Sequence, residues 1–86
     1  MSAPRVMLAG GVRTPIGNFG GALAGSSAAA LGGIAARAAL ERAGVPAMAV
    51  DEAIVGHARM AGNGTNLARQ LVRRAELGAP VPADTI

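Results

Sequence analysis

The sequence contains no cysteine among its 86 residues. This absence excludes a disulfide framework, a thiolate metal site and a thiol nucleophile within the chain. The single histidine, His57, has no second metal ligand near it in the sequence, so we expect no metal site. A lone histidine after a strand more often makes a structural hydrogen bond, and we favour that role for His57.

Large aromatic side chains are almost absent as well. Phe19 is the only one, although an aromatic residue buries roughly 150–250 Å² and commonly anchors a core. Much of the apolar share of 51% is alanine, which contributes little buried area, and the 13 glycines each lose extra backbone entropy on folding. We therefore expect residues 1–86 to be one part of a larger fold, whose apolar faces are covered by other elements.

Lysine is absent too, so the net charge of +3 comes from arginine alone. The arginines are scattered, and only Arg69, Arg73 and Arg74 gather, at a spacing typical of one solvated helix face. A nucleic-acid module also needs aromatic stacking platforms or a known docking motif. No run of residues is apolar and long enough for a signal peptide or a membrane span. The composition therefore predicts no nucleic-acid partner, no membrane partner and a cytoplasmic protein.

Hydrophobic runs and turn residues predict an alternation of strands and helices. The expected elements are a strand at Val6–Val12, a helix at Ser27–Ala43, a strand at Val50–Gly56, a helix at Asn66–Leu77 and an extended end between Pro80 and Ile86. Phe19 and Leu23 are expected to pin down the glycine-rich loop before the first helix. This β-α-β-α-β order predicts an α/β fold with a largely parallel sheet. Such a sheet needs cover on both faces, so with two helices it is incomplete.

Capping residues define both helices. Ser26 or Ser27 can accept a hydrogen bond from the first turn of the first helix, and Gly44 suits the left-handed position after its end. The second helix is capped by Asn66 or the preceding threonine and is expected to end at Gly78.

Two pairs of residues inside the first helix carry further predictions. Gly32 and Gly33 each cost about 1 kcal/mol relative to alanine in a helix interior, so we expect a neighbouring backbone to approach closely there. Arg37 and Glu41 are spaced to form an outward-facing ion pair one turn apart.

Signatures of ligand binding are incomplete. Gly62 and Gly64 begin like a dinucleotide-binding loop, but Leu67 occupies the position of the third glycine. Asp51 and Glu52 are adjacent at the start of a strand, so their side chains point to opposite faces and cannot form an acid–base pair.

Four segments together resemble the opening part of thiolases. Val12–Gly21 (VRTPIGNFGG) is similar to the loop after the first strand of that family, and Leu31–Gly44 (LGGIAARAALERAG) is similar to its first helix. Val50–Gly56 is similar to its second strand, and Ala61–Gln70 (AGNGTNLARQ) to the loop and helix that follow. The four motifs occur in the family's order and spacing and cover nearly the whole chain.

The resemblance implies a thiolase-like fold with two similar five-stranded sheets, of which this chain supplies the start. Thiolases join or cleave acyl groups on coenzyme A through a cysteine, which in the family follows closely after a segment similar to Pro82–Ile86. The activating histidine and a second cysteine lie in the family's C-terminal half. The resemblance therefore implies no catalytic, cofactor-binding or metal-binding residue in this chain, acyl-CoA as the family's substrate, and no activity for the 86 residues alone.

Asn66, Arg69 and Gln70 are the candidates for an interface or an active-site support, because the resemblance places them near the dimer interface and the nucleophile's loop. The alternative is that Asn66 only caps the helix and Arg69 is solvated. Leu67 departs from the family, which has a proline there. The implied partner is the remainder of a thiolase chain or a thiolase-like subunit, with a homo-oligomer as the whole enzyme.

Three functions are compatible with these observations to different degrees. The leading hypothesis is the N-terminal part of an acetyl-CoA C-acetyltransferase. The second is a non-catalytic partner subunit that assembles with a thiolase-like chain through exposed apolar faces, or a truncated inactive fragment. A basic RNA-binding module is disfavoured for the reasons given above.

Overall fold

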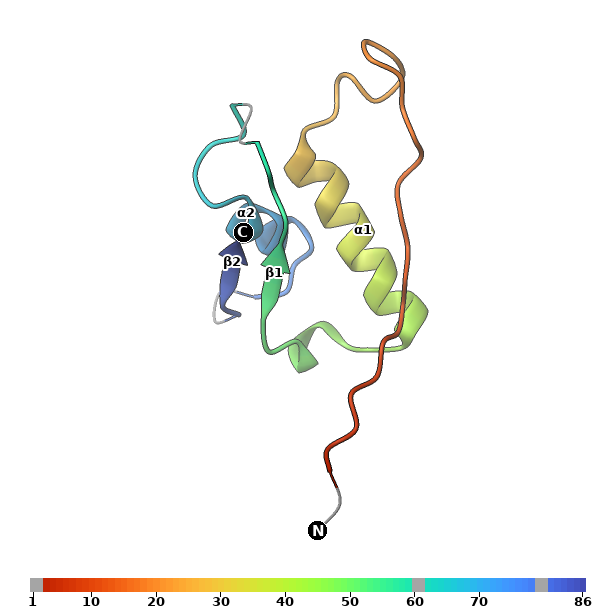
Figure 1. Cartoon of the computed structure of the whole chain (residues 1–86), viewed down its shortest axis with the longest axis vertical. Helices are drawn as coiled ribbons and strands as arrows, with labels where there is room; N and C mark the ends of the chain where they lie inside the picture. Colours follow the sequence, from red (N-terminus) through yellow and green to blue (C-terminus); the bar gives the residue numbers. More distant parts are fainter. Residues whose placement is uncertain (1–2, 60–61, 79–80) are drawn as a thin grey trace.

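The computed structural model describes residues 3–59, 62–78 and 81–86. Ala61 and Pro80, which entered the sequence predictions, lie outside these ranges. The elements are helix α1 (Ala28–Ala43), the 3₁₀ turn η1 (Ala47–Ala49), strand β1 (Ala53–Val55), helix α2 (Leu67–Arg74) and strand β2 (Ala83–Thr85), as Figure 1 shows.

Helix α1 begins and ends where its capping residues predict. The Ser27 hydroxyl accepts a hydrogen bond from the Ala30 backbone N–H at 3.0 Å, which satisfies one free donor of the first turn. Gly44 has φ +69°, and the N–H of Val45 reaches back to the carbonyl of Leu40 at 3.0 Å. This is the left-handed helix ending that glycine permits at no steric cost, so the predicted helix is confirmed.

Helix α2 ends three residues before the predicted end at Leu77. The left-handed position is taken by Glu76, with φ +60°, and not by Gly78. The N–H of Glu76 bonds to the carbonyl of Arg73, and that of Leu77 to the carbonyl of Val72, both at 3.1 Å. These two bonds complete a Schellman ending. The predicted end was wrong because a glutamate carries no sequence signal for a left-handed residue.

The two helices pack closely through the paired glycines of α1. A Cβ atom on Gly33 would lie 2.8 Å from the Cβ of Arg74, and one on Gly32 would strike the side chain of Leu71. Both glycines therefore leave room for α2. The predicted close approach of a neighbouring backbone is found at Gly33, whereas the neighbour of Gly32 is a side chain.

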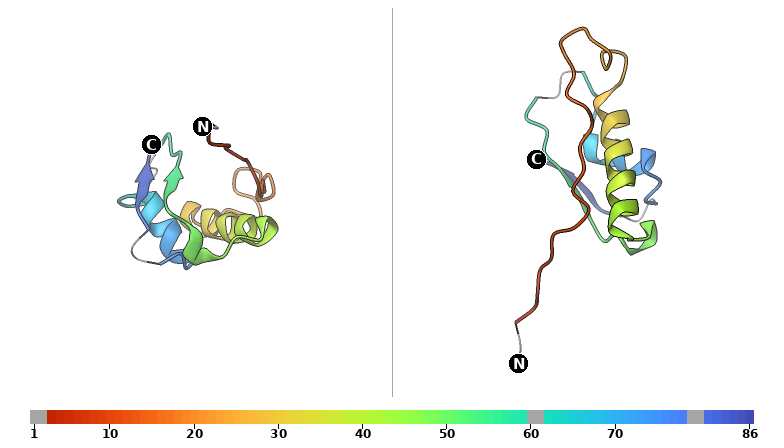
Figure 2. Two further views of the ribbon diagram at one scale, coloured as in Figure 1. Left: turned by 90° about the horizontal axis from the view of Figure 1, so that it is seen from below. Right: turned by 90° about the vertical axis from the view of Figure 1, so that its right-hand side faces the viewer.

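Strands β1 and β2 form a two-stranded parallel sheet, with α2 as the connection between them. Ala53 pairs with Ala83, and Val55 pairs with Thr85. Figure 2 shows α2 crossing one face of the two strands. The α/β class and the parallel pairing are confirmed, although β1 is shorter than the predicted strand Val50–Gly56.

The expected first strand, Val6–Val12, is not a strand in the structure. This segment is exposed, with Val6 at 89% and Leu8 at 98% of full exposure, and only its later part passes along α1 (Figure 1). Gly10 lies against α1, since a Cβ atom there would be 2.5 Å from the carbonyl oxygen of Ala39. A strand needs a hydrogen-bonded neighbour, and here β1 and β2 pair with each other while this segment contacts a helix. The observed order of elements therefore lacks the first strand.

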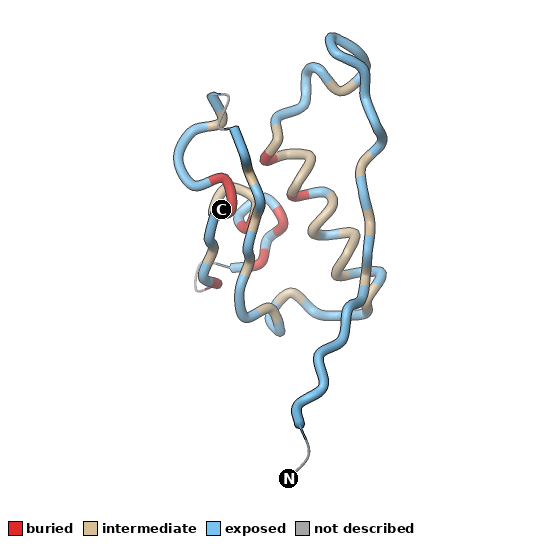
Figure 3. Tube along the Cα trace, viewed as in Figure 1, coloured by how far each residue is buried: buried red, intermediate tan, exposed pale blue. Residues whose placement is uncertain are grey.

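The core is small: the buried positions lie mainly on α2 and just after it, with a few on α1 (Figure 3), and partly buried residues of α1 and both strands pack against them. Its buried cluster consists of Val72, Ala75, Leu77 and Val81. Leu23 packs on Gly17 in the long loop as expected, but Phe19 is fully exposed, so its predicted role in pinning this loop was wrong.

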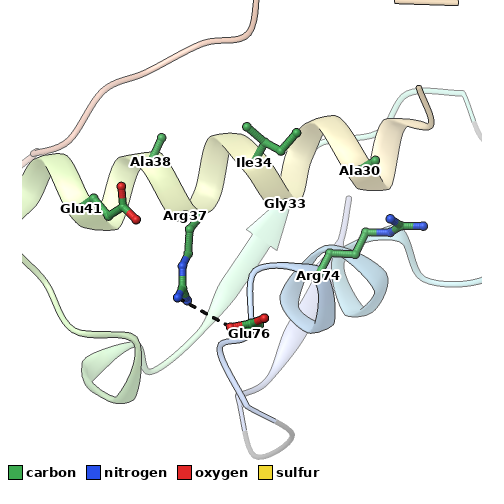
Figure 4. A pocket seen from close by; sticks show the side chains of 8 residues that line it. All are labelled: Ala30, Gly33, Ile34, Arg37, Ala38, Glu41, Arg74 and Glu76. Atoms are coloured by element: carbon green, nitrogen blue, oxygen red, sulfur yellow. Dashed lines mark ion pairs between the residues drawn. The ribbon is translucent and has the colours of Figure 1, made fainter. Parts of the chain in front are cut away.

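Arg37 does not form the predicted pair with Glu41. Its guanidinium donates to the carbonyl oxygen of Ala75 at 2.9 Å and lies 3.6 Å from a carboxylate oxygen of Glu76. Figure 4 shows the side chain reaching from α1 to the end of α2, on the edge of an open hollow between the two helices. Arg37 thus joins the two helices, because a cation is favoured at the carbonyl end of a helix.

Replacing Arg37 with methionine is expected to destabilise the end of α2 by about 1 kcal/mol, mainly through the lost bond to the partly buried carbonyl of Ala75. Glu76→Gln should cost less than about 0.5 kcal/mol, since its side chain is 78% exposed and such ion pairs contribute little. Amide hydrogen exchange of Leu77 measures both effects. Glu41→Gln is the control, and an equal effect of all three substitutions would contradict the assignment.

Candidate functional site

The N-terminus of α2 meets the carboxyl ends of β1 and β2 at one edge of the structure, which we call the strand-end edge. In a parallel β-α-β unit these ends lie together, and ligands of open α/β sheets bind outside the carboxyl ends of the strands. All three residues singled out from the sequence lie on α2 or at its cap. Asn66 and Gln70 contact segments beside this edge, whereas Arg69 contacts Val81, which precedes β2.

Asn66 connects the start of α2 to β2. Its side-chain oxygen accepts hydrogen bonds from the backbone N–H of Arg69 at 3.2 Å and from the hydroxyl of Thr85 at 2.8 Å. Its amide nitrogen donates to the carbonyl of Ala83 at 3.2 Å. The backbone is left-handed, with φ +39°, a conformation that asparagine tolerates better than most residues. Asn66 is therefore the predicted cap and also holds a strand that follows it by 17 residues.

Thr85 is part of the same network, and sequence reasoning missed it. Besides donating to Asn66, its hydroxyl accepts from the backbone N–H of Ala68 at 3.0 Å. That amide belongs to the first turn of α2, where donors lack partners within the helix. The pairing joins residues far apart in the chain, so no local pattern could have indicated it.

Arg69 bonds within the chain instead of being solvated. Its guanidinium donates to the carbonyl oxygen of Val81 at 2.7 Å, and the residue is half-buried. This contact holds the segment that enters β2. The alternative of a solvated Arg69 was therefore wrong.

Gln70 holds the loop that precedes α2. Its amide nitrogen donates to the carbonyl of Asn63 at 2.7 Å and to that of Thr65 at 3.0 Å. Gly64 has φ +84°, and a Cβ atom there would lie 3.2 Å from the same nitrogen. Glycine at this position therefore supplies both the backbone conformation and the space for Gln70.

The three predicted residues thus each contact a different segment of this chain: Asn66 and Gln70 beside the strand ends, and Arg69 before the start of β2. Their role between chains stays a prediction. Within the described ranges there is no cluster of three or more potential metal ligands. Over the same residues no helix is long and apolar enough to cross a bilayer.

A parallel β-α-β unit with a preceding helix defines an α/β fold. Residues 6–86 match the family model described as the thiolase N-terminal domain. The chain therefore belongs to the thiolase family, as its four sequence motifs predicted.

Its relatives are acetyl-CoA acetyltransferases. The chain is 52% identical to a probable acetyl-CoA acetyltransferase of Escherichia coli (strain K12) and 48% identical to an acetyl-CoA acetyltransferase of Cupriavidus necator. Each match spans 81 residues, 94% of this chain and 21% of the relative. Among solved structures it is similar to the Acat5 thiolase of Ascaris suum in complex with coenzyme A, with a TM-score of 0.79 and 34% identity over 87% of this chain and 20% of that one. The chain thus spans about a fifth of the length of these relatives.

Proposed function

We propose that this chain is the N-terminal part of an acetyl-CoA acetyltransferase, located in the cytoplasm. The enzyme would join or cleave acyl groups on coenzyme A through a cysteine outside these 86 residues. The observation that carries the proposal is the family match over residues 6–86, supported by 52% identity to the E. coli relative.

The chemistry requires groups that this chain does not contain. A thiolate attacks a thioester carbonyl carbon, the coenzyme A thiolate leaves, and a histidine or a helix N-terminus lowers the pKa of the attacking thiol. The developing oxyanion needs oriented donors. With no cysteine in its sequence, the chain acts as a scaffold: Asn66 and Thr85 hold the end of β2 against α2, and Gln70 holds the neighbouring loop.

The remainder of a thiolase chain, or a thiolase-like subunit, is the proposed partner. Large apolar side chains are exposed on the segment before α1, on β1 and at the last residue; they are Val6, Met7, Leu8, Ile16, Phe19, Ile54 and Ile86. A complete soluble domain rarely exposes so many large apolar side chains. We propose that the rest of the enzyme covers it, and that Asn66, Arg69 and Gln70 support a contact between subunits of a homo-oligomer.

A full-length chimera tests the proposal. In it, residues 1–86 of this chain replace the matching part of the E. coli relative. We expect the chimera to cleave acetoacetyl-CoA with coenzyme A, followed by the loss of substrate absorbance, and the 86 residues alone to show no turnover. An inactive but folded chimera would contradict the proposal, as would turnover by the 86 residues unaided.

The exposed apolar surface also fits the alternative of a non-catalytic partner subunit. In that case the chimera would be inactive, and the separate chain would co-purify with a complete thiolase-like protein.

A further inference from the structure

One more residue of the strand-end edge, His57, directly contacts the end of β2. Its backbone N–H donates to the carbonyl oxygen of Ile86 at 2.7 Å, and the N–H of Ile86 donates to the carbonyl of Val55 at 2.9 Å. The parallel ladder therefore continues beyond both strands. His57 is the residue against which the polypeptide is held as it leaves β2.

The side chain of His57 is tied to the loop before α2. Its ring is half-buried, and Nε2 lies 3.4 Å from the side-chain nitrogen of Asn63. An amide nitrogen only donates, so Nε2 is the acceptor in this contact. The backbone carbonyl of Asn63 in turn accepts from Gln70 at 2.7 Å. A series of contacts thus runs from the end of β1, through the loop, to α2.

The loop before α2 contains two glycines in backbone conformations that other residues rarely adopt. Gly62 and Gly64 have φ +76° and +84°, and glycines at such angles leave the backbone free to adopt many alternatives. The hydrogen bonds of Asn63 and Gln70 therefore limit where this loop lies relative to the strand ends.

We infer that His57 is a positioning residue for the reaction at this edge. Its backbone holds the end of β2 and its ring holds the glycine-containing loop, so both segments beside the strand ends are placed relative to one residue. Ligands bind at such edges, and a misplacement of about 1 Å can cost about 100-fold in rate. The inference rests on the proposed function, because that function supplies the reaction.

The full-length chimera allows a matched pair of substitutions. In His57→Gln the side-chain oxygen reaches the position of Nε2 and can still accept from Asn63, whereas the amide of His57→Asn reaches only as far as Nδ1. We expect His57→Ala and His57→Asn to lower kcat for thiolysis about tenfold, with KM changed less than about twofold, and His57→Gln to stay within about threefold of the unsubstituted chimera. Glutamine as damaging as alanine, or alanine without effect, overturns the inference.

Amide hydrogen exchange gives a second measurement that needs no activity. Exchange in residues 62–65 should be faster in His57→Ala and His57→Asn than in His57→Gln, while Ile86 serves as an internal reference, because its bonds to His57 and Val55 are backbone bonds that all three variants keep. An unsubstituted chimera without activity would contradict the proposed function alone. Equal exchange in the unsubstituted chimera and all three variants would contradict the positioning role alone.

Discussion

Gly33→Leu is expected to weaken the packing of α1 on α2 by about 3 kcal/mol, the largest effect of any single substitution considered. Even a Cβ atom at this position would lie 2.8 Å from the Cβ of Arg74 and 3.7 Å from the backbone nitrogen of Ala75. The contact is with backbone and Cβ atoms, which cannot rotate away, so the helices must separate. A leucine gains about 1 kcal/mol in helix propensity, which offsets only part of this cost.

The measurement is amide hydrogen exchange of Leu71 and Val72 in the full-length chimera. A loss of about 3 kcal/mol corresponds to exchange about 100-fold faster when it occurs through local opening. Gly56→Leu is the matched control. It introduces the same side chain at a position where a Cβ atom would have no atom within 4 Å apart from its chain neighbours. Equal exchange in the two variants would contradict the close packing of the helices.

Asn66→Ala is expected to have the second largest effect, a loss of about 2–3 kcal/mol at the strand-end edge. Removal of a helix cap costs about 1 kcal/mol, and each further hydrogen bond to β2 contributes about 1 kcal/mol. Alanine also tolerates the left-handed backbone of this residue poorly. The hydroxyl of Thr85 and the carbonyl of Ala83 both lose a partner.

The exchange rates of the Ala68 and Ile86 amides report this loss, because the first donates to Thr85 and the second belongs to the strand ladder. Asn66→Asp keeps the oxygen that caps the helix and loses only the donor, so we expect less than about half of the effect. Asn18→Ala, in the exposed loop before α1, serves as the control. If aspartate and alanine are equally damaging, the capping oxygen is not the main contribution.

Local signals in the sequence were sufficient for both ends of α1 and for the start of α2, but not for the end of α2. Ser27 and Gly44 bound α1 as predicted, and Asn66 caps α2, because capping depends on hydrogen bonds to residues within one turn. The paired glycines Gly32 and Gly33 predicted a close neighbour from their cost alone. They could not identify α2 as that neighbour.

Predictions that depended on a distant partner were less successful. The run at Val6–Val12 has the composition of a buried strand, yet pairing requires another strand beside it, and the structure places the later part of this run along α1. Arg37 has a suitable acid one turn away, but its contacts are the carbonyl of Ala75 and the carboxylate of Glu76. Both outcomes depend on how α1 lies relative to the rest of the chain.

The sequence by itself determined the family, the α/β class, both caps of α1 and the N-terminal cap of α2, because these depend on residue types at short, fixed spacing. Only the tertiary structure decided that Thr85 pairs with Asn66, that Arg69 holds Val81, and that His57 meets the end of β2. These contacts join segments separated by 12 to 29 residues. Their partners are set by how α2 packs on the two strands, and local sequence carries no signal for that packing.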